Sequence, residues 1–469
     1  MDKILKYTYF SLLLIALIAA VPIILLGLQG YVGNNHILTA WDELYSVREV
    51  YQILNSSSLK NFTLNIIAGN GYAYGRFMYM LDSLFACIPY WLFGLKGLIF
   101  SVRLAHTCYL ILGFHLIIRL FISNWVYRLL CLGIFLVFPF TNYFAAMPKP
   151  EPLQLLLLGI FFTIKDKNWA WIFLGLALGS KVSLLFGVFF LLVFSLWQCK
   201  KNSLQLFYWA KTFGYFLLGL CIAIPGLVFA LFNPYFRNGI MHIFSSSQKP
   251  YDDHSLTIFD WLKYYFLDFF AMPSIINCLF AASIFIFAII MFCKNKKDRN
   301  YIIFSFLLLI PIMLFTKRLW GHYLFLGLIL LLPLLFKFIE NYINSKKIIF
   351  LSFGLSVFFI LFIGKSALNT YQIILNRENT TLFINTRSQT QLAILKCLNH
   401  KKSVIGIDLD LYYQFDWYVE KSKNGIYYTI QNKQEASKCD CLILSEKRII
   451  VFKDIETRNE TMVEIIKID

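Results

Sequence analysis

Long apolar runs separated by short basic segments constrain this chain more than any other feature. The first run extends from about Tyr7 to Leu28 and follows Lys3 and Lys6. A helix of about 20 apolar residues is needed to cross the hydrocarbon core of a bilayer. This run is long enough, and the sequence GLQGYVG near its end is a poor cleavage site for a signal peptide. We therefore predict a retained transmembrane helix.

The composition places the whole chain in the membrane class. Of its 469 residues, 59% are hydrophobic, 18% are aromatic and only 15% are charged, with a mean hydropathy of +0.65. In soluble domains about a quarter of all residues are charged. The net charge of +17 does not indicate a nucleic-acid partner, because the basic residues lie between the apolar runs. Their placement instead indicates membrane topology.

The basic clusters predict how the chain crosses the membrane. Placing all of them in the cytoplasm, as the positive-inside rule directs, puts the N-terminus inside and the C-terminus outside. These clusters are 119–128, 165–167, 200–211, 294–299 and 337–347. About eleven transmembrane helices follow, at 7–28, 98–121, 128–145, 151–164, 169–180, 182–198, 207–232, 269–293, 300–316, 322–339 and 347–365. The stretch 169–198 is either two short helices or one long broken helix.

Three segments then lie on the outer side, namely residues 29–97, residues 233–266 and the tail 366–469. In the first of them, an amphipathic helix around 41–54 can lie on the membrane surface, and 74–95 is a second interfacial or re-entrant helix. The fold class is thus an α-helical polytopic membrane protein.

The tail differs in character from the rest of the chain. Its stretches SVIGIDLDLYYQFDWYV, GIYYTI and CLILSEKRIIVF are typical of short strands, so we predict a small extracytoplasmic α/β domain. In an oxidising compartment Cys397 is expected to pair with Cys439 or with Cys441, and the sequence leaves the choice open.

Acidic candidates for catalysis occur at two places. Asp42 and Glu43 lie in the first turn of the helix around 41–54, where they also suit the helix dipole. A carboxylate just outside the bilayer can deprotonate a hydroxyl group, and adjacent residues point about 100° apart, so one of them can face a site. Glu151 follows Pro150 at the start of a later helix, where the same dipole explanation applies.

Basic candidates lie at the predicted outer ends of the helices. Lys181 interrupts an apolar stretch, either in mid-membrane, where charge is costly and usually functional, or at an outer junction where an anion can reach it. Lys149 is either a site residue or a lysine that snorkels to the interface. Arg318 and His322 oppose the positive-inside trend and therefore favour an anionic partner, with a lipid headgroup as the alternative. Arg237, after the sequence NPYF, is a further candidate.

The order of these motifs resembles one family of membrane enzymes. The motifs are the acidic pair after the first helix, YGRFMYMLDSLF, AMPKPEPLQLLLLGIFF, LGLALGSKVSLLF, NPYF and RLWGHYLFLGLILLLP. Together, over residues 1–340, they resemble the GT-C membrane glycosyltransferases, particularly the branch of protein O-mannosyltransferases and bacterial aminoarabinose transferases. The resemblance implies that residues 1–365 form a GT-C-like membrane domain.

The resemblance also implies an activity. Such enzymes move a sugar, usually with inversion, from a polyprenyl-phosphate carrier to a glycolipid, polysaccharide or protein acceptor at the outer face of the plasma (inner) membrane. It implies different metal requirements in different members, so a divalent cation such as Mg²⁺ or Mn²⁺ stays open as a cofactor, and the sequence shows no compelling ligand cluster.

Roles for individual residues follow from the matching positions. Asp42, with Glu43 beside it, matches the acidic residue of the first loop, which acts as base or binds the acceptor. Glu151 matches a second acidic position that is often Asp, and Lys149 precedes it. The remaining matches concern the donor. Lys181 matches a lysine near the carrier phosphate, although Ser180 stands where Thr is common. The R…Y region before the tenth helix is matched by Arg318, His322 and Tyr323.

Other classes of protein fit the sequence less well. A polysaccharide polymerase or O-antigen ligase usually carries its arginines in one large late loop and lacks an early acidic helix. A transporter or lipid-linked-sugar flippase needs polar residues through several helices and usually repeated halves. A non-enzymatic scaffold leaves Lys181 without a purpose.

Overall fold

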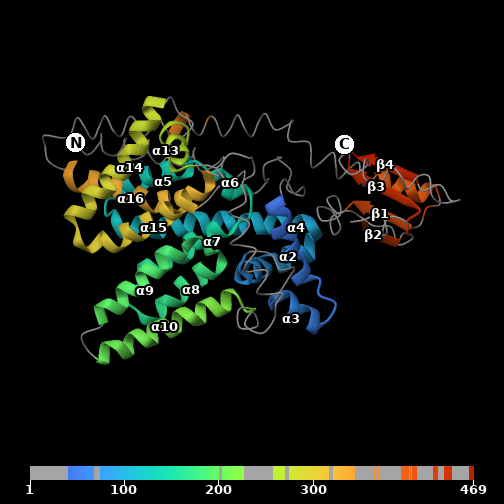
Figure 1. Ribbon diagram of the computed structural model, residues 1–469, viewed down its shortest axis with the longest axis horizontal. Helices are drawn as coiled ribbons and strands as arrows, with labels where there is room; N and C mark the ends of the chain where they lie inside the picture. Colours follow the sequence, from blue (N-terminus) through green and yellow to red (C-terminus); the bar gives the residue numbers. More distant parts are fainter. Residues whose placement is uncertain are drawn as a thin grey trace. The chain divides into compact units, whose positions relative to one another are not determined.

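The computed structural model of the protein (Figure 1) consists of two compact units. The first contains the described residues from Glu49 to position 368, and the second contains residues 41–48 and the described residues from 392 onward. The structure describes residues 41–67, 74–199, 203–226, 257–269, 274–315, 321–343, 363–365, 368, 392–400, 402, 404–408, 426–430, 438–445 and 464–468. The domain boundary expected after residue 365 stays a prediction.

The first unit is built from helices. They are α2 (Trp41–Leu54, whose end from Glu49 belongs here), α3 (Leu59–Ile67), α4 (Arg76–Phe121), α5 (Trp125–Leu136), α6 (Thr141–Ala146), α7 (Pro150–Thr163), α8 (Trp171–Ser180), α9 (Leu185–Cys199), α10 (Ser203–Ala223), α13 (Ile258–Leu267), α14 (Ser274–Lys294), α15 (Arg299–Phe315) and α16 (Phe325–Ile343). Short 3₁₀ turns precede four of them, at Asn168–Ala170, Val182–Leu184, Lys296–Asp298 and Gly321–Leu324.

Within the described residues, four helices are long and apolar enough to cross a membrane. They are Arg76–Phe121, Gln205–Ala223, Ile275–Lys294 and His322–Asn341. A fifth candidate is the pair Asn168–Ser180 and Val182–Gln198, which is bent by 120° at its break. The expected helix 7–28 and most of the expected helix 347–365 lie outside the described residues, so the total number stays a prediction.

The structure corrects the predicted helices 128–145 and 207–232. The stretch 128–145 is not one helix but two, α5 and α6, since Pro139 disfavours helical geometry at the residue before it and Phe140 adopts a φ of 67°. Helix α10 ends at Ala223 rather than at residue 232 because Pro225 follows two residues later.

Helix α4 is a hairpin of two helical arms. Its backbone leaves the helical region at Gly94, with φ 60° and ψ −142°. Asp82 and His106 would lie about 36 Å apart along one straight helix, yet Asp82 Oδ2 is 2.9 Å from His106 Nε2. Tyr109 donates to the other oxygen of Asp82 at 3.1 Å, and all three side chains are buried. The predicted helix 74–95 therefore folds back on the predicted helix 98–121.

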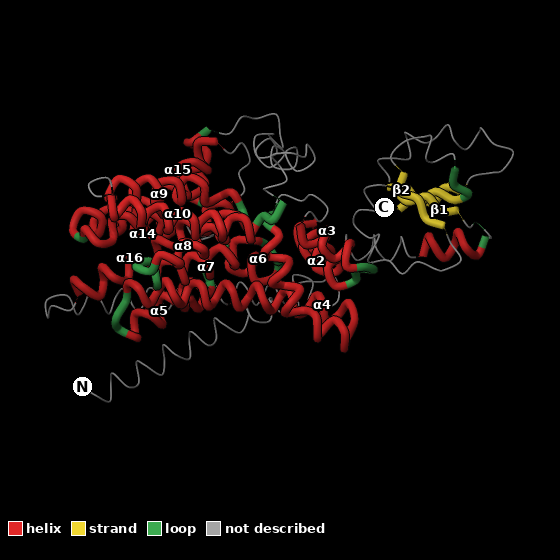
Figure 2. Tube along the Cα trace, turned by 90° about the horizontal axis from the view of Figure 1, so that it is seen from below, coloured by secondary structure: helices red, strands yellow, loops and turns green. Residues whose placement is uncertain are grey.

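Charged segments that are far apart in sequence meet at one end of this unit. Lys337 Nζ in α16 lies 2.6 Å from Asp298 Oδ2, and Glu340 accepts the backbone N–H of Ser123 at 3.0 Å. We call the residues Ser123, Asp298, Lys337 and Glu340 the basic end, since they lie within or beside three of the basic clusters. Figure 2 shows the helices that reach it, among them α5, α14 and α16. These contacts agree with the prediction that the three clusters share one side.

The second unit contains a parallel sheet of four strands, in the order β2-β1-β3-β4. The strands are β1 (Val404–Asp408), β2 (Ile426–Ile430), β3 (Cys441–Ser445) and β4 (Glu464–Ile468), and residues 392–399 form a helix before β1. Each of the three predicted stretches contains one strand, whereas β4 was not predicted. A disulfide joins Cys397 to Cys441, which settles the pairing that the sequence leaves open.

The hairpin at Gly94 predicts a backbone-specific effect on stability. A residue with a Cβ is strained at the φ of Gly94, so Gly94→Ala should lower the free energy of unfolding by about 1–3 kcal/mol. The matched control is Gly214→Ala in α10, because a Cβ at either glycine meets nothing within 4 Å. The control replaces a helical glycine and should stabilise by about 0.5–1 kcal/mol. Thermal unfolding in detergent measures both, and equal melting temperatures for the two variants would contradict the strained turn.

Candidate active site

Lys181 lies where the chain breaks between α8 and α9. Its backbone is extended, with φ −159° and ψ 136°, and the two flanking helices are bent by 120°. The structure thus has two short helices at this stretch, with the lysine at their junction. A break of this kind frees the last carbonyl groups of the first helix, which then need other donors.

Gln154 supplies one of these donors from α7. Its side-chain amide nitrogen donates to the carbonyl oxygens of Ala177, at 2.9 Å, and of Lys181, at 2.8 Å. The side chain is fully buried. Gln154 was not among the predicted site residues, although a single amide directly before the apolar run LLLLGIFF is a signal that the sequence contains.

Glu151 lies one helical turn before Gln154 and pairs with Lys181. The distance from Lys181 Nζ to Glu151 Oε1 is 2.5 Å, and only 15% and 5% of the two side chains are exposed. The second carboxylate oxygen of Glu151 is buried and has no hydrogen-bond partner among the residues that the structure describes. A carboxylate accepts several hydrogen bonds, so this pair retains capacity for another donor.

Two further predicted residues lie beside this pair. His322 and Tyr323 belong to the 3₁₀ turn before α16. The Lys181 ammonium lies 5.4 Å from the centre of the Tyr323 ring. The His322 ring stacks on Tyr143 at 5.3 Å with an interplanar angle of 28°. Lys149, which is buried, places its ammonium 5.0 Å from the same Tyr143 ring. Aromatic faces of this kind favour cations by electrostatic attraction.

The structure therefore brings five predicted residues into one cluster. They are Lys149, Glu151, Lys181, His322 and Tyr323. Sequence reasoning missed the aromatic partner Tyr143 and also Tyr74, whose ring lies 5.6 Å from the Lys181 ammonium. Tyr74 is the first residue of the motif YGRFMYMLDSLF, but nothing in the sequence assigns a site role to it or to Tyr143 among 27 tyrosines.

The described part of the structure does not show where the other predicted residues lie relative to this cluster. Arg237 and Arg318 lie outside the described residues. Asp42 and Glu43 lie in the first turn of α2, and their side chains are outside the described part of the structure. Among the residues that the structure describes, no group of three or more His, Cys, Asp or Glu is placed to hold a metal ion.

The chain that leads into α4 is hydrogen-bonded to the break between α8 and α9. The backbone N–H of Gly75 donates to the carbonyl oxygen of Ser180 at 3.0 Å. A Cβ at Gly75 would lie 2.1 Å from the carbonyl oxygen of Gly179, so only glycine allows this approach. This contact holds the neighbouring Tyr74 ring against Lys181.

The cluster lies at the opposite end of α7 from the basic end. Helix α7 begins at Pro150, beside Lys149, and its residue Phe162 contacts Tyr301, three residues after Asp298. A helix of this length spans about 21 Å. The candidate site and the basic end are therefore separated by most of the thickness of a bilayer core.

Comparison with known proteins reports on the fold. No family model and no curated protein matches this sequence. Two solved structures of ArnT from Cupriavidus metallidurans match it, in the apo state and bound to undecaprenyl phosphate, with TM-scores of 0.54 and 0.55. Each is 12% identical in sequence, and the match covers 97% of this chain and 90% and 89% of theirs. The chain thus has the fold of ArnT, which confirms the GT-C resemblance at the level of the fold.

The ion pair at the break predicts strong coupling between its two residues. Removing one partner of a buried pair leaves an unpaired charge and costs about 3–5 kcal/mol, and the partial exposure of Lys181 reduces the expected loss to about 1–3 kcal/mol. Glu151→Gln and Lys181→Met should each lower the melting temperature, and the double variant should recover most of the loss. A double-mutant cycle measures the coupling. Strictly additive losses would show that the pair contributes nothing.

Proposed function

We propose that this protein is an integral-membrane glycosyltransferase that moves a sugar from a polyprenyl-phosphate carrier to an acceptor hydroxyl group. One observation carries the proposal: a lysine–glutamate pair, flanked by a second lysine, lies at the end of a helix bundle with the fold of ArnT. A structure of that protein holds undecaprenyl phosphate. A lysine at the end of an apolar bundle suits a donor with a phosphate head and a lipid tail.

The basic residues suit the departure of the carrier. As the bond between the sugar and the phosphate breaks, its electron pair stays on the phosphate oxygen and negative charge grows there. Lys181 and Lys149 are held in place in a largely buried site, where fixed positive charge stabilises a developing anion most effectively. We assign Arg318, four residues before His322, to the same phosphate, and Arg237 as a further contact.

The acidic residues suit activation of the acceptor. Attack by the acceptor hydroxyl on the anomeric carbon, opposite the phosphate, inverts that carbon and needs a carboxylate to take the proton. We assign this role to Asp42, with Glu43 beside it. Glu151 already holds Lys181, so its role is to orient the lysine, while its second oxygen remains able to accept a hydrogen bond from the substrate.

The reaction is proposed to take place at the outer face of the plasma (inner) membrane. The positive-inside rule puts the basic end in the cytoplasm, and the candidate site lies at the other end of α7. The disulfide between Cys397 and Cys441 supports an oxidising compartment for the C-terminal unit. The acceptor is a cell-surface glycolipid, polysaccharide or protein.

Loss of Lys181 tests the proposed donor chemistry. Lys181→Met should lower the turnover number by about 100- to 1000-fold, the loss typical of removing one group that stabilises a developing anion. The assay is transfer of labelled sugar from polyprenyl phosphate by the purified protein in liposomes. Lys337→Met is the matched control, because Lys337 also pairs with a carboxylate and is 17% exposed, but lies at the basic end. Equal activities of the two variants would refute the assignment, and movement of the lipid-linked sugar without transfer would favour a flippase.

The proposed base has its own test. Asp42→Asn keeps the shape of the side chain and removes its ability to accept a proton, so transfer should fall by about 100- to 10,000-fold. Binding of polyprenyl phosphate should stay unchanged, since Asp42 is not assigned to the carrier. Full transfer activity in Asp42→Asn, together with loss of activity in Glu43→Gln, would move the role of base to Glu43.

A further inference from the structure

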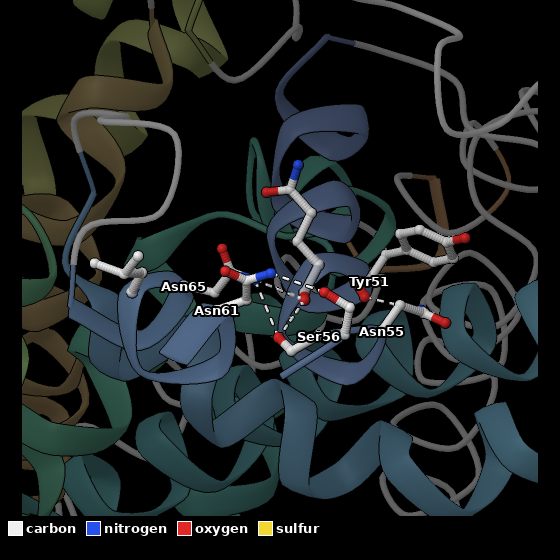
Figure 3. Close-up of a pocket in the computed structure, with 8 residues that line it drawn as sticks. Tyr51, Asn55, Ser56, Asn61 and Asn65 are labelled. Carbon is white, nitrogen blue, oxygen red and sulfur yellow. Dashed lines mark hydrogen bonds between the residues drawn. The ribbon is translucent and has the colours of Figure 1, made fainter. Parts of the chain in front are cut away.

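A polar cavity lies at the corner between α2 and α3. It has a volume of about 310 Å³, at the small end of the range for ligand pockets. Figure 3 shows its side chains converging from the end of α2, the short connection and α3. The lining residues are Tyr51, Gln52, Asn55, Ser56, Ser57, Asn61, Leu64 and Asn65.

Hydrogen bonds hold the lining of this cavity in place. The Asn65 amide nitrogen, from α3, donates to the carbonyl oxygen of Gln52 at 2.9 Å and to the Ser56 hydroxyl at 3.1 Å. The Asn61 amide nitrogen donates to the Ser57 hydroxyl at 2.8 Å, and the Asn55 side-chain oxygen accepts from Tyr90 at 2.9 Å. Side chains that are ordered before a ligand arrives cost less entropy on binding.

A buried ion pair supports the two helices that line the cavity. Arg76, at the start of α4, pairs with Glu49 of α2, and both are buried. The same guanidinium donates to the backbone carbonyl oxygen of Asn65 and, at 3.4 Å, to that of Ile66. Arg76 therefore joins the end of α3 to α2, and this junction fixes the spacing of the two walls.

The chemistry of the lining selects the class of ligand. None of the eight lining residues is charged, so the cavity offers no cation to a phosphate or carboxylate. Amide and hydroxyl side chains both donate and accept, as sugar hydroxyls do, and an aromatic ring offers an apolar face to sugar C–H groups. Burial raises the pKa of Tyr51, and the neighbouring Tyr90 raises it further. The Tyr51 hydroxyl therefore remains a donor at neutral pH.

We infer that this cavity binds one neutral sugar unit. The inference goes beyond the proposed function, because the cavity contains none of the residues assigned to transfer. Residues Tyr74, Gly75 and Arg76 link it to the candidate site, since Tyr74 contacts Lys181 and Arg76 supports Asn65. The backbone from Tyr74 to Arg76 spans at most about 7 Å. Under the proposed function, the sugar is part of the acceptor glycan or part of the donor, and the same chemistry serves both.

Ligand-observed NMR tests the inference without turnover. The probes are the methyl glycosides of glucose, galactose, mannose and N-acetylglucosamine, with inorganic phosphate and glucuronate as charged comparisons, and the full-length protein is held in nanodiscs. At least one neutral glycoside should give a saturation-transfer signal. Leu64→Trp should remove this signal by filling the cavity, since Leu64 lines it and is 50% exposed.

The control variant is Thr63→Ala, on the same exposed helix but outside the lining, and it should keep the signal. The inference is overturned if no neutral glycoside gives a signal that Leu64→Trp removes, or if the charged probes bind equally well. The transfer assay distinguishes the two sources of the sugar. If Leu64→Trp raises the KM for the acceptor at least tenfold, the cavity binds an acceptor sugar. If it raises the KM for the donor by the same factor, the cavity binds a donor sugar.

Failure of this inference and failure of the proposed function give different results. A protein that transfers sugar but shows no cavity-dependent glycoside signal retains the function and loses the subsite. A protein that shows the signal in the absence of any transfer retains the subsite and loses the function.

Discussion

The geometry of the candidate site depends on the hydrogen bonds that Gln154 makes to the end of α8. A chain that turns through 120° between two apolar helices exposes carbonyl groups in a region where water is scarce, and each one left unsatisfied is costly. Gln154 satisfies two of them from a neighbouring helix. The turn holds Lys181 in an extended conformation at the end of the bundle, within reach of Glu151. Without that amide, the carbonyl groups of Ala177 and Lys181 would lose this donor.

Two lysine–carboxylate pairs in the helical unit differ in the hydrogen bonds that their carboxylate oxygens accept. At the basic end, one oxygen of Asp298 accepts from both Lys337 and Asn295, each at 2.6 Å. At the candidate site, Glu151 accepts from Lys181 through one oxygen, while the other has no hydrogen-bond partner among the described residues. The first pair closes a helix junction. The second keeps acceptor capacity in a buried place, which suits a site that receives a substrate.

Much of the fold could be predicted from the sequence because apolar length and basic placement are local signals. Lys181 stood out for the same reason, as a single charge within an apolar stretch. Its pairing with Glu151 across thirty residues could not be predicted, because it depends on how α7 packs against α8. The hairpin that joins Asp82 to His106 is equally non-local, and aromatic residues such as Tyr143 are too common here for one of them to carry a signal. The positions of Arg318 and Asp42 relative to the cluster stay predictions.

The three residues before and at the start of α4 have a thermodynamic consequence. Tyr74 packs against Lys181, Gly75 is hydrogen-bonded to Ser180, and Arg76 is bonded to the end of α3. If a ligand at one end of this connection shifts these residues, the free energy of ligand binding at the other end changes with them. Such coupling is reciprocal by necessity: whatever one occupant does to the affinity of a second, the second does to the first by the same factor. Residues 74–76 thus form a short covalent connection between a residue at the candidate site and a residue that supports the cavity.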